Sequence, residues 1–231
     1  MKQQNTKKAI IFDSGTLISF SMNGVTDILK KLKKIFNGNF VITPDVKREV
    51  IDRPIQIKKF SLEALKIKQL LDEKFLEMPS SLGLNDMEVA KKTEEMLDKA
   101  NSTYKDKKRD IHILDSGEAS CFAVSKMLNE KGFETLIAVD ERTMRMLGEK
   151  PENLARLLEK KLHIKINPNR NNYNFFKEFK FIRSAELAYI AYKKGVIDLK
   201  NGRVLDALLY AMKFKGCAIS NEEINEIERM A

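Results

Sequence analysis

Residues 9–18 read AIIFDSGTLI, and this stretch decides the fold. Four consecutive apolar residues lie between two lysines and an Asp-Ser-Gly segment. This pattern predicts a short strand that is buried on both faces, as in a parallel sheet. Asp13 follows the carboxyl end of that strand, which is where ligands bind in open α/β sheets. The alternative is that Asp13 only caps a helix that begins near Ser14.

The composition is that of a globular protein outside the membrane. Of the 231 residues, 43% are hydrophobic and 32% are charged, which is long enough and apolar enough for a sizeable core. No apolar run approaches the roughly 18 residues of a membrane span, and the first eight residues are polar, so we expect no membrane association and a cytoplasmic protein. Cys121 and Cys217 lie far apart without nearby metal-ligand partners, so we expect two buried thiols.

The charge of the chain points to a polyanionic partner. The formal net charge is +9 and the sequence pI is about 9.3. Lysine and arginine bind nucleic acids by neutralising phosphates and releasing counterions. Lysine-rich surfaces also keep proteins soluble, so the charge alone leaves both interpretations open.

Glu49 lies in a helix that is predicted to begin at Thr43 and Pro44. Threonine is a favourable N-cap, and proline is tolerated at the first helical position. Glu49 follows Val46 by three residues, so it borders the apolar stripe of this helix. The alternative is a surface glutamate that pairs with Lys47 or Arg53.

Two more acids occupy junctions like that of Asp13. Glu118 follows Asp115 by three residues after the apolar run at 111–114, and Asp140 follows the apolar strand predicted at 135–139. Each has a purely structural alternative: Asp115 and Glu118 match a capping box, and Asp140 could cap the next helix. His112 has no nearby ligand partners, so a structural role is the simpler interpretation.

The rest of the chain alternates between predicted strands and helices. We expect further strands at 40–42 and 75–78, an exposed edge strand at 162–166, a mobile charged loop at 101–110 and a linker at 167–172. Helical patterns cover residues 25–36, 57–71, 85–100, 184–194, 204–215 and 221–230.

Taken together, the four acids indicate a metal site. A parallel sheet places Asp13 and Asp140 side by side, and the turns that carry Glu49 and Glu118 would converge on the same edge. Four carboxylates in one crevice repel each other unless a divalent cation neutralises them. Mg²⁺ or Mn²⁺ suits an all-oxygen ligand set. On a basic chain, such a site indicates a phosphodiester substrate.

The sequence resembles the PIN-domain ribonucleases. The resemblance rests on four short motifs in order, at 10–15, 43–50, 114–119 and 138–142, and the third is similar to that of an uncharacterised archaeal and bacterial PIN-like subgroup. It implies a Rossmann-like, three-layer α/β/α fold with a central parallel sheet, and Mg²⁺- or Mn²⁺-dependent cleavage of RNA by a metal-activated water. The catalytic and metal-ligating residues would then be Asp13, Glu49, Glu118 and Asp140.

The resemblance covers only part of the chain. The PIN-like domain would span residues 1–166 with a charged insertion at about 85–110, whose lysines and arginines could contact phosphates. Residues 167–231 would form a helical extension packed on the domain or on a second subunit. Ser14 would orient a ligand or a phosphate, and Asp115 and Glu141 would support the ligating acids.

Other functions fit parts of the pattern. Residues 12–17 are similar to the nucleophile loop of haloacid-dehalogenase-like phosphatases, but Gly15 stands where that loop has a second acid. A noncatalytic PIN fold that binds RNA or serves in an assembly is the main alternative. A toxin paired with an antitoxin and a homodimer also stay open.

Overall fold

The computed structural model describes residues 7–107 and 109–230. Its main sheet has the strand order β2-β1-β5-β7, and every pairing in it is parallel. The predicted strands around residues 9–12, 40–42 and 135–139 are confirmed, as is the parallel sheet. The strands are β1 (Lys7–Phe12), β2 (Asn39–Ile42), β5 (Phe133–Ala138) and β7 (Phe181–Ile182).

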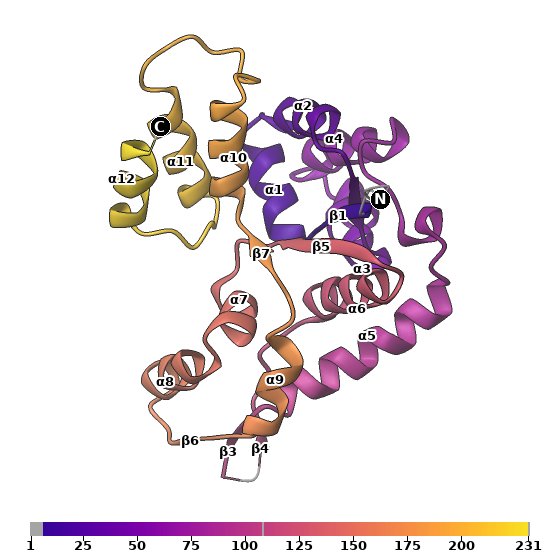
Figure 1. The fold of residues 1–231 in the computed structure, drawn as a ribbon, viewed down its shortest axis with the longest axis vertical. Coiled ribbons are helices and arrows are strands. Elements are labelled where there is room, and N and C mark those ends of the chain that lie inside the picture. The colour runs from indigo at the N-terminus through magenta and orange to yellow at the C-terminus, as the bar shows by residue number, and fades with distance from the viewer. Residues whose placement is uncertain (1–6, 108, 231) are drawn as a thin grey trace, which may run out of the picture.

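Helices flank this sheet, so the fold belongs to the α/β class. In Figure 1, β5 runs between α1 and α10 on one side and α3 and α6 on the other, an arrangement compatible with three layers. None of the helices in the described residues is long and apolar enough to cross a membrane. The helices are α1 (Ser14–Met22), α2 (Thr26–Ile35), α3 (Pro44–Lys47), α4 (Ser61–Asp72), α5 (Asp86–Asn101), α6 (Ser116–Glu130), α7 (Arg142–Glu149), α8 (Pro151–Leu162), α9 (Tyr173–Phe176), α10 (Ser184–Lys193), α11 (Val204–Phe214) and α12 (Asn221–Arg229).

β1 is the centre of the core. It lies between β2 and β5, and its residues Ile11 and Phe12 are fully buried. A strand that is covered on both faces needs consecutive apolar residues instead of an alternating pattern, which is why residues 9–12 read as they do. Because β1 and β5 are parallel neighbours, Phe12 pairs with Ala138 and the two strands end at the same edge of the sheet.

The segment at 75–78 was predicted to be a strand, and that prediction is wrong. It makes only a bridge between Glu77 and Val41, in which the Glu77 N–H donates to Phe40 and the Ile42 N–H donates to Glu77. Pro79 has no N–H to continue a ladder, and a 3₁₀ helix, Pro79–Leu82, begins there.

The charged loop at 101–110 was predicted to be mobile, and that prediction is wrong for the residues described. It contains β3 (Tyr104–Asp106) and β4 (Arg109–Asp110), which form a small antiparallel sheet with β6 (Ile166–Pro168); Lys108 lies outside the described residues. The Tyr104 ring is fully buried, and its hydroxyl donates to the Pro151 carbonyl at 2.9 Å. The partner strand is remote in sequence, so local composition could not reveal the pairing.

The edge strand predicted at 162–166 is also wrong. α8 continues to Leu162, and His163 ends the helix in a left-handed conformation with φ of 54°. β6 starts only at Ile166 and lies in the small sheet instead of the main one. This short stretch, in which apolar residues alternate, contains the end of a helix followed by an extended turn.

The segment at 167–172 is tied to the body of the protein, so the predicted linker is wrong. The Asn169 N–H donates to Thr103 at 2.7 Å, and the Asn172 side-chain amide donates to Lys99 at 3.0 Å. The chain then forms α9 and returns to the main sheet as β7, where Phe181 pairs with Ile137 of β5. Residues beyond 166 therefore add β7 to the main sheet before α10 begins.

The three predicted C-terminal helices are confirmed as α10, α11 and α12. α10 contacts α1, α2 and α11, and α11 contacts α12, so this group of helices packs on the body of the same chain (Figure 1). Ser220 caps α12, because the Glu223 N–H donates to its hydroxyl at 3.1 Å. The charged stretch predicted as an insertion is dominated by α5, which packs along α6.

Candidate functional site at the carboxyl ends of β1 and β5

Asp13 follows β1 directly and caps α1. The Gly15 N–H donates to its Oδ2 at 3.1 Å, so the capping role left open by the sequence is present. Only 4% of the residue is exposed, and Oδ1 has no hydrogen-bond partner among the described residues. Capping therefore accounts for one of the two carboxylate oxygens, and the other is buried without a hydrogen-bond partner.

Asp140 lies beside Asp13 but does not cap the helix that follows it. The N-cap of α7 is Glu141, whose Oε2 accepts from the Met144 N–H at 2.8 Å. Asp140 is 2% exposed, and its Oδ1 accepts from the N–H of Ser184, the first residue of α10, at 2.7 Å. Its Oδ2 has no hydrogen-bond partner among the described residues. The alternative of a simple local cap is therefore wrong for Asp140.

Glu118 is held by the predicted capping box at the start of α6. The Asp115 N–H donates to its Oε2 at 3.0 Å. His112 lies on the exposed side of this turn, and its Nε2 is 2.8 Å from the Asp115 carboxylate. The capping box thus accounts for one carboxylate oxygen of Glu118. The side chain is half-buried, so the charges of neighbouring acids act on it.

Glu49 lies in a π-helical segment, Arg48–Asp52, that continues α3. Lys47 pairs with Asp52 at 2.6 Å, so that lysine is not its partner, although Arg53 does lower the pKa of Glu49. The carboxylate instead lies against Gly117, where a Cβ atom would be 2.6 Å from Oε1. The absence of a side chain at Gly117 therefore makes room for Glu49 beside the turn that carries Glu118.

Charges within this group of acids act on one another. Burial raises the pKa of Asp13 to about 6; the N–H groups of Gly15 and Ser14 oppose this rise, and the charges of Glu49 and Asp140 add smaller contributions to it. Burial also raises the pKa of Glu118 to about 8, and the charge of Asp13 adds to that effect. The pKa of Glu49 is raised as well, mainly by burial. Each raised pKa shows that the carboxylate lacks enough compensating positive charge.

The donor set has the chemistry that a hard divalent cation requires. It consists of carboxylate oxygens, and Asp13 and Asp140 each keep one buried oxygen without a donor. As the side chains stand, however, no group of three or more His, Cys, Asp or Glu side chains in residues 7–107 and 109–230 is placed to hold one ion. The acids fit a cation in chemistry and neighbourhood, and a shared coordination sphere would need side-chain movement.

The supporting residues named from the sequence have specific places. Burial raises the pKa of Glu49, and hydrogen bonding to the Ser14 hydroxyl opposes that rise; the orienting role of Ser14 stays a prediction. Glu141 raises the pKa of Glu118 through its charge. Both cysteines are free and buried, as predicted; burial, followed by the charge of Asp140, raises the pKa of Cys217 to about 12.

Sequence reasoning missed three residues at this edge. Thr16 in the first turn of α1 is fully buried, and its hydroxyl has no hydrogen-bond partner among the described residues. Asp45 accepts from the Ser116 hydroxyl at 2.8 Å and so joins α3 to α6. Ser184 supplies the donor to Asp140. Asp45 could have been found from the motif at 43–50, but nothing local connects Ser184 with Asp140.

Comparisons with known proteins found no matching family model, no matching curated protein and no matching solved structure. The function must therefore be inferred from the side chains themselves.

Proposed function

We propose that this chain is a divalent-metal-dependent ribonuclease of the PIN type. It hydrolyses RNA phosphodiester bonds with Asp13, Glu49, Glu118 and Asp140 as ligands of Mg²⁺ or Mn²⁺. The observation that carries the proposal is the pair of bare carboxylate oxygens, Asp13 Oδ1 and Asp140 Oδ2, buried at the adjacent ends of β1 and β5. Buried charges are normally paired or coordinate metals. Neither oxygen has a hydrogen-bond partner at ordinary distance among the described residues, and the neighbouring donor of Asp140 is the weakly donating Cys217 thiol.

The chain prepares the ligands in distinct ways. The Gly15 N–H fixes one oxygen of Asp13, and the Ser184 N–H fixes one oxygen of Asp140, so each aspartate has one oriented and one free oxygen. The Asp115 N–H holds Glu118, and Gly117 leaves room for Glu49. A bound divalent ion would polarise the scissile phosphate and lower the pKa of a water molecule. The raised pKa values would fall on binding, because the ion supplies the missing positive charge.

The PIN-type assignment rests on order as well as on chemistry. The first, second and fourth motifs lie at or directly after the ends of β1, β2 and β5, and the third lies at the start of α6. The parallel order β2-β1-β5 brings the first and fourth motifs together. A noncatalytic RNA-binding or assembly module with the same fold is the alternative, and the following test separates it from the enzyme.

Metal binding is tested by thermal unfolding with and without Mn²⁺. A ligand of the native state at a hundredfold excess over its dissociation constant stabilises by about 2.7 kcal/mol. We expect this stabilisation, and cleavage of single-stranded RNA, in the wild type and in Asp98→Asn, which changes an exposed aspartate far along α5. Both should be lost in Asp13→Asn and Asp140→Asn. Asparagine caps a helix as well as aspartate does, so a capping role alone predicts no loss.

Gly117→Ala gives a second variant with an intact fold. Alanine is favoured over glycine inside a helix by about 1 kcal/mol, and the atoms it would strike belong to the movable end of Glu49. We therefore expect undiminished stability without metal and reduced Mn²⁺ stabilisation, as in Glu49→Gln. A wild type that shows neither Mn²⁺ stabilisation nor RNA cleavage would overturn the enzyme and leave the binding module.

A further inference from the structure

A large basic groove begins where the acidic edge ends. It has a volume of about 850 Å³ and lies between α7 and α8 on one side and residues 218–223 on the other. Its lining contains five cationic side chains and two acidic ones, Glu149 and Glu223. The cationic side chains are Arg142, Arg145, Lys150, Arg156 and Lys160.

Most of these cations are available to a ligand. Arg142, Lys150, Arg156 and Lys160 are exposed, and none of the four forms an ion pair within the part of the chain that the structure describes. Arg156 and Lys160 are four residues apart on α8, so they lie one turn apart on the same face. The groove therefore presents four exposed cationic side chains that are not held in ion pairs, beside two acidic ones.

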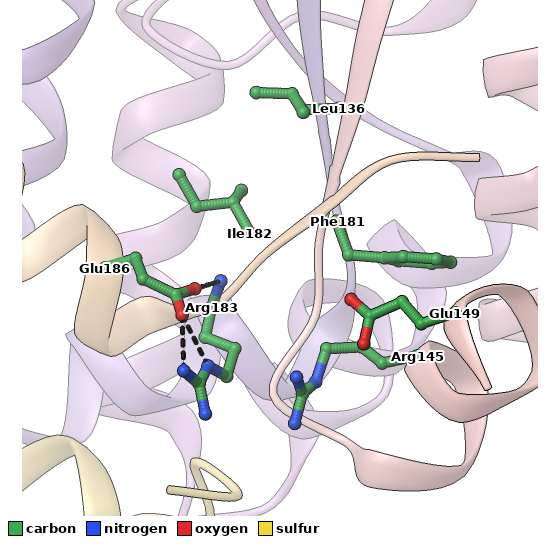
Figure 2. Close-up of a pocket in the computed structure, with 7 residues that line it drawn as sticks. All are labelled: Leu136, Arg145, Glu149, Phe181, Ile182, Arg183 and Glu186. Atoms are coloured by element: carbon green, nitrogen blue, oxygen red, sulfur yellow. Dashed lines mark hydrogen bonds and ion pairs between the residues drawn. The ribbon is translucent and has the colours of Figure 1, made fainter. Parts of the chain in front are cut away.

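Arg145 differs from its neighbour Arg183. In Figure 2, Glu186 holds the Arg183 guanidinium, and the Arg145 guanidinium lies nearby and points in the same direction. Arg183 also reaches Glu223 at 2.9 Å, whereas Arg145 makes one long hydrogen bond of 3.3 Å to the Ala218 carbonyl. The Nε of Arg145 is buried without a partner. Arg145 is thus less fully hydrogen-bonded than Arg183, although its charge also acts on Glu223.

The groove is connected to the acidic edge through the backbone. α7 begins at Arg142, two residues after Asp140, and the Ala218 N–H donates to the Asp140 carbonyl at 3.1 Å. One wall of the groove is therefore fixed to the residue that the proposed reaction needs. The backbone thus places Arg142 and Ala218, which line the groove, next to Asp140.

We propose that this groove binds the sugar-phosphate backbone of single-stranded RNA and directs it to the acidic edge. Cations that are spaced along a groove suit a chain of phosphates. Met146 and Leu157, which are half-buried, line the same groove and offer apolar surface to unstacked bases, which a duplex would not present. The role in substrate delivery rests on the proposed function, but binding by the groove does not.

The test measures RNA binding without cleavage. Fluorescence anisotropy of a labelled oligouridylate in EDTA gives the affinity of the full chain at several salt concentrations. For single strands, the slope of log K against log salt is about −0.7 for each phosphate contact. The double variant Arg156→Gln, Lys160→Gln should therefore bind more weakly, with a slope shallower by about 1.4. The matched control Lys58→Gln, Lys91→Gln removes the same charge from exposed lysines outside the groove and should behave as the wild type.

Three results would overturn the groove: no RNA binding by the wild type, equal affinity and slope in the groove variant, or an equal loss in the control variant. Competition by polyglutamate as strong as that by unlabelled oligouridylate would also overturn it, because the groove would then fit an acidic protein instead. If the groove variant binds RNA as tightly as the wild type and still cleaves it, the groove is overturned and the ribonuclease stands. A groove that passes the salt test in a protein that never cleaves RNA overturns the ribonuclease alone.

Discussion

The two carboxylate oxygens of Asp13 lie in opposite environments. Its Oδ2 lies at the N-terminus of α1 and accepts an N–H, which favours the charged form, whereas its Oδ1 is buried without a donor. Burial outweighs the cap, since the pKa is raised to about 6. Without a cation, this aspartate destabilises the fold at neutral pH.

The sign of that effect gives a pH prediction. The carboxyl of Asp13 ionises near 3.8 when unfolded and near 6 when folded, so the native state holds the proton more tightly across that interval. The free energy of unfolding of the wild type should therefore fall relative to Asp13→Asn as the pH rises through it. A shift of this size corresponds to on the order of 3 kcal/mol.

Chemical denaturation of both proteins in EDTA, from about pH 4 to about pH 7, measures this difference. Asp98→Asn serves as the control and should track the wild type across the range. A constant difference between wild type and Asp13→Asn would show that the side chain has an ordinary pKa in the folded protein.

At the residue scale, the sequence pointed to Asp13 and Asp140 because each follows an apolar run. It pointed to Glu118 because this acid lies at a helix start, and to Glu49 because it borders the apolar stripe of a helix. It could not decide between capping and ligand binding, since the structure has Asp13 capping with one oxygen and leaving the other bare. Asp140 shows the limit more clearly. Two adjacent acids follow β5, and only the tertiary contact with Ser184 distinguishes Asp140 from the true cap, Glu141.

At the scale of elements, the start of α10 supports the end of β5. The Ser184 N–H lies at the first position of its helix, where it has no intrahelical partner, and it donates to Asp140 instead. Arg183 and Glu186 hold the same turn through a salt bridge. An element far along the chain therefore sets the orientation of a candidate ligand.

Ser184→Pro tests this contact. Proline is tolerated at the first helical position and lacks an N–H, and the preceding residue already has an extended backbone with ψ of 164°. We expect α10 to persist while Asp140 loses its donor, at a cost of roughly 1.5–3 kcal/mol for a hydrogen bond to a charged group. Urea denaturation at neutral pH measures the loss. Ser184→Ala, which keeps the N–H, is the control, and equal stability of the two variants would contradict the role of this hydrogen bond.

Elements with a strong local signal were predictable and those that depend on distant partners were not. β1 and β5 are apolar runs, and α2, α10 and α12 show clear helical periodicity or caps. β3, β6 and β7 contain only two or three residues each, and each exists because a remote strand pairs with it. Short strands of this kind carry too few residues to show a period of two.

At the scale of the whole molecule, the C-terminal part belongs to the same folded unit as the rest of the chain. It supplies β7 to the sheet, the donor to Asp140 and the helices that cover α1 and α2. Apolar side chains of this part are buried, among them Leu205, Leu208 and Leu209.

Truncation after Pro168 should therefore abolish cooperative unfolding or solubility. The shortened chain would expose the edge of β5 and the apolar surfaces of α1 and α2, which promotes aggregation. Circular dichroism melting and size-exclusion chromatography follow the change. A truncated chain that keeps the melting transition of the full protein would rule out this dependence.

The strand order also affects how the chain folds while the ribosome synthesises it. β1 leaves the ribosome early, but its neighbour β5 follows only after α1 to α6 have been made, and β7 comes later still. Until then β1 is an apolar strand with one open edge, since only β2 is at hand to pair with it. Sheets whose neighbours are distant in sequence fold slowly and expose sticky intermediates. The nascent chain should therefore depend on chaperones until β5 and β7 emerge, and slower translation of the segments between β1 and β5 would lengthen that exposure.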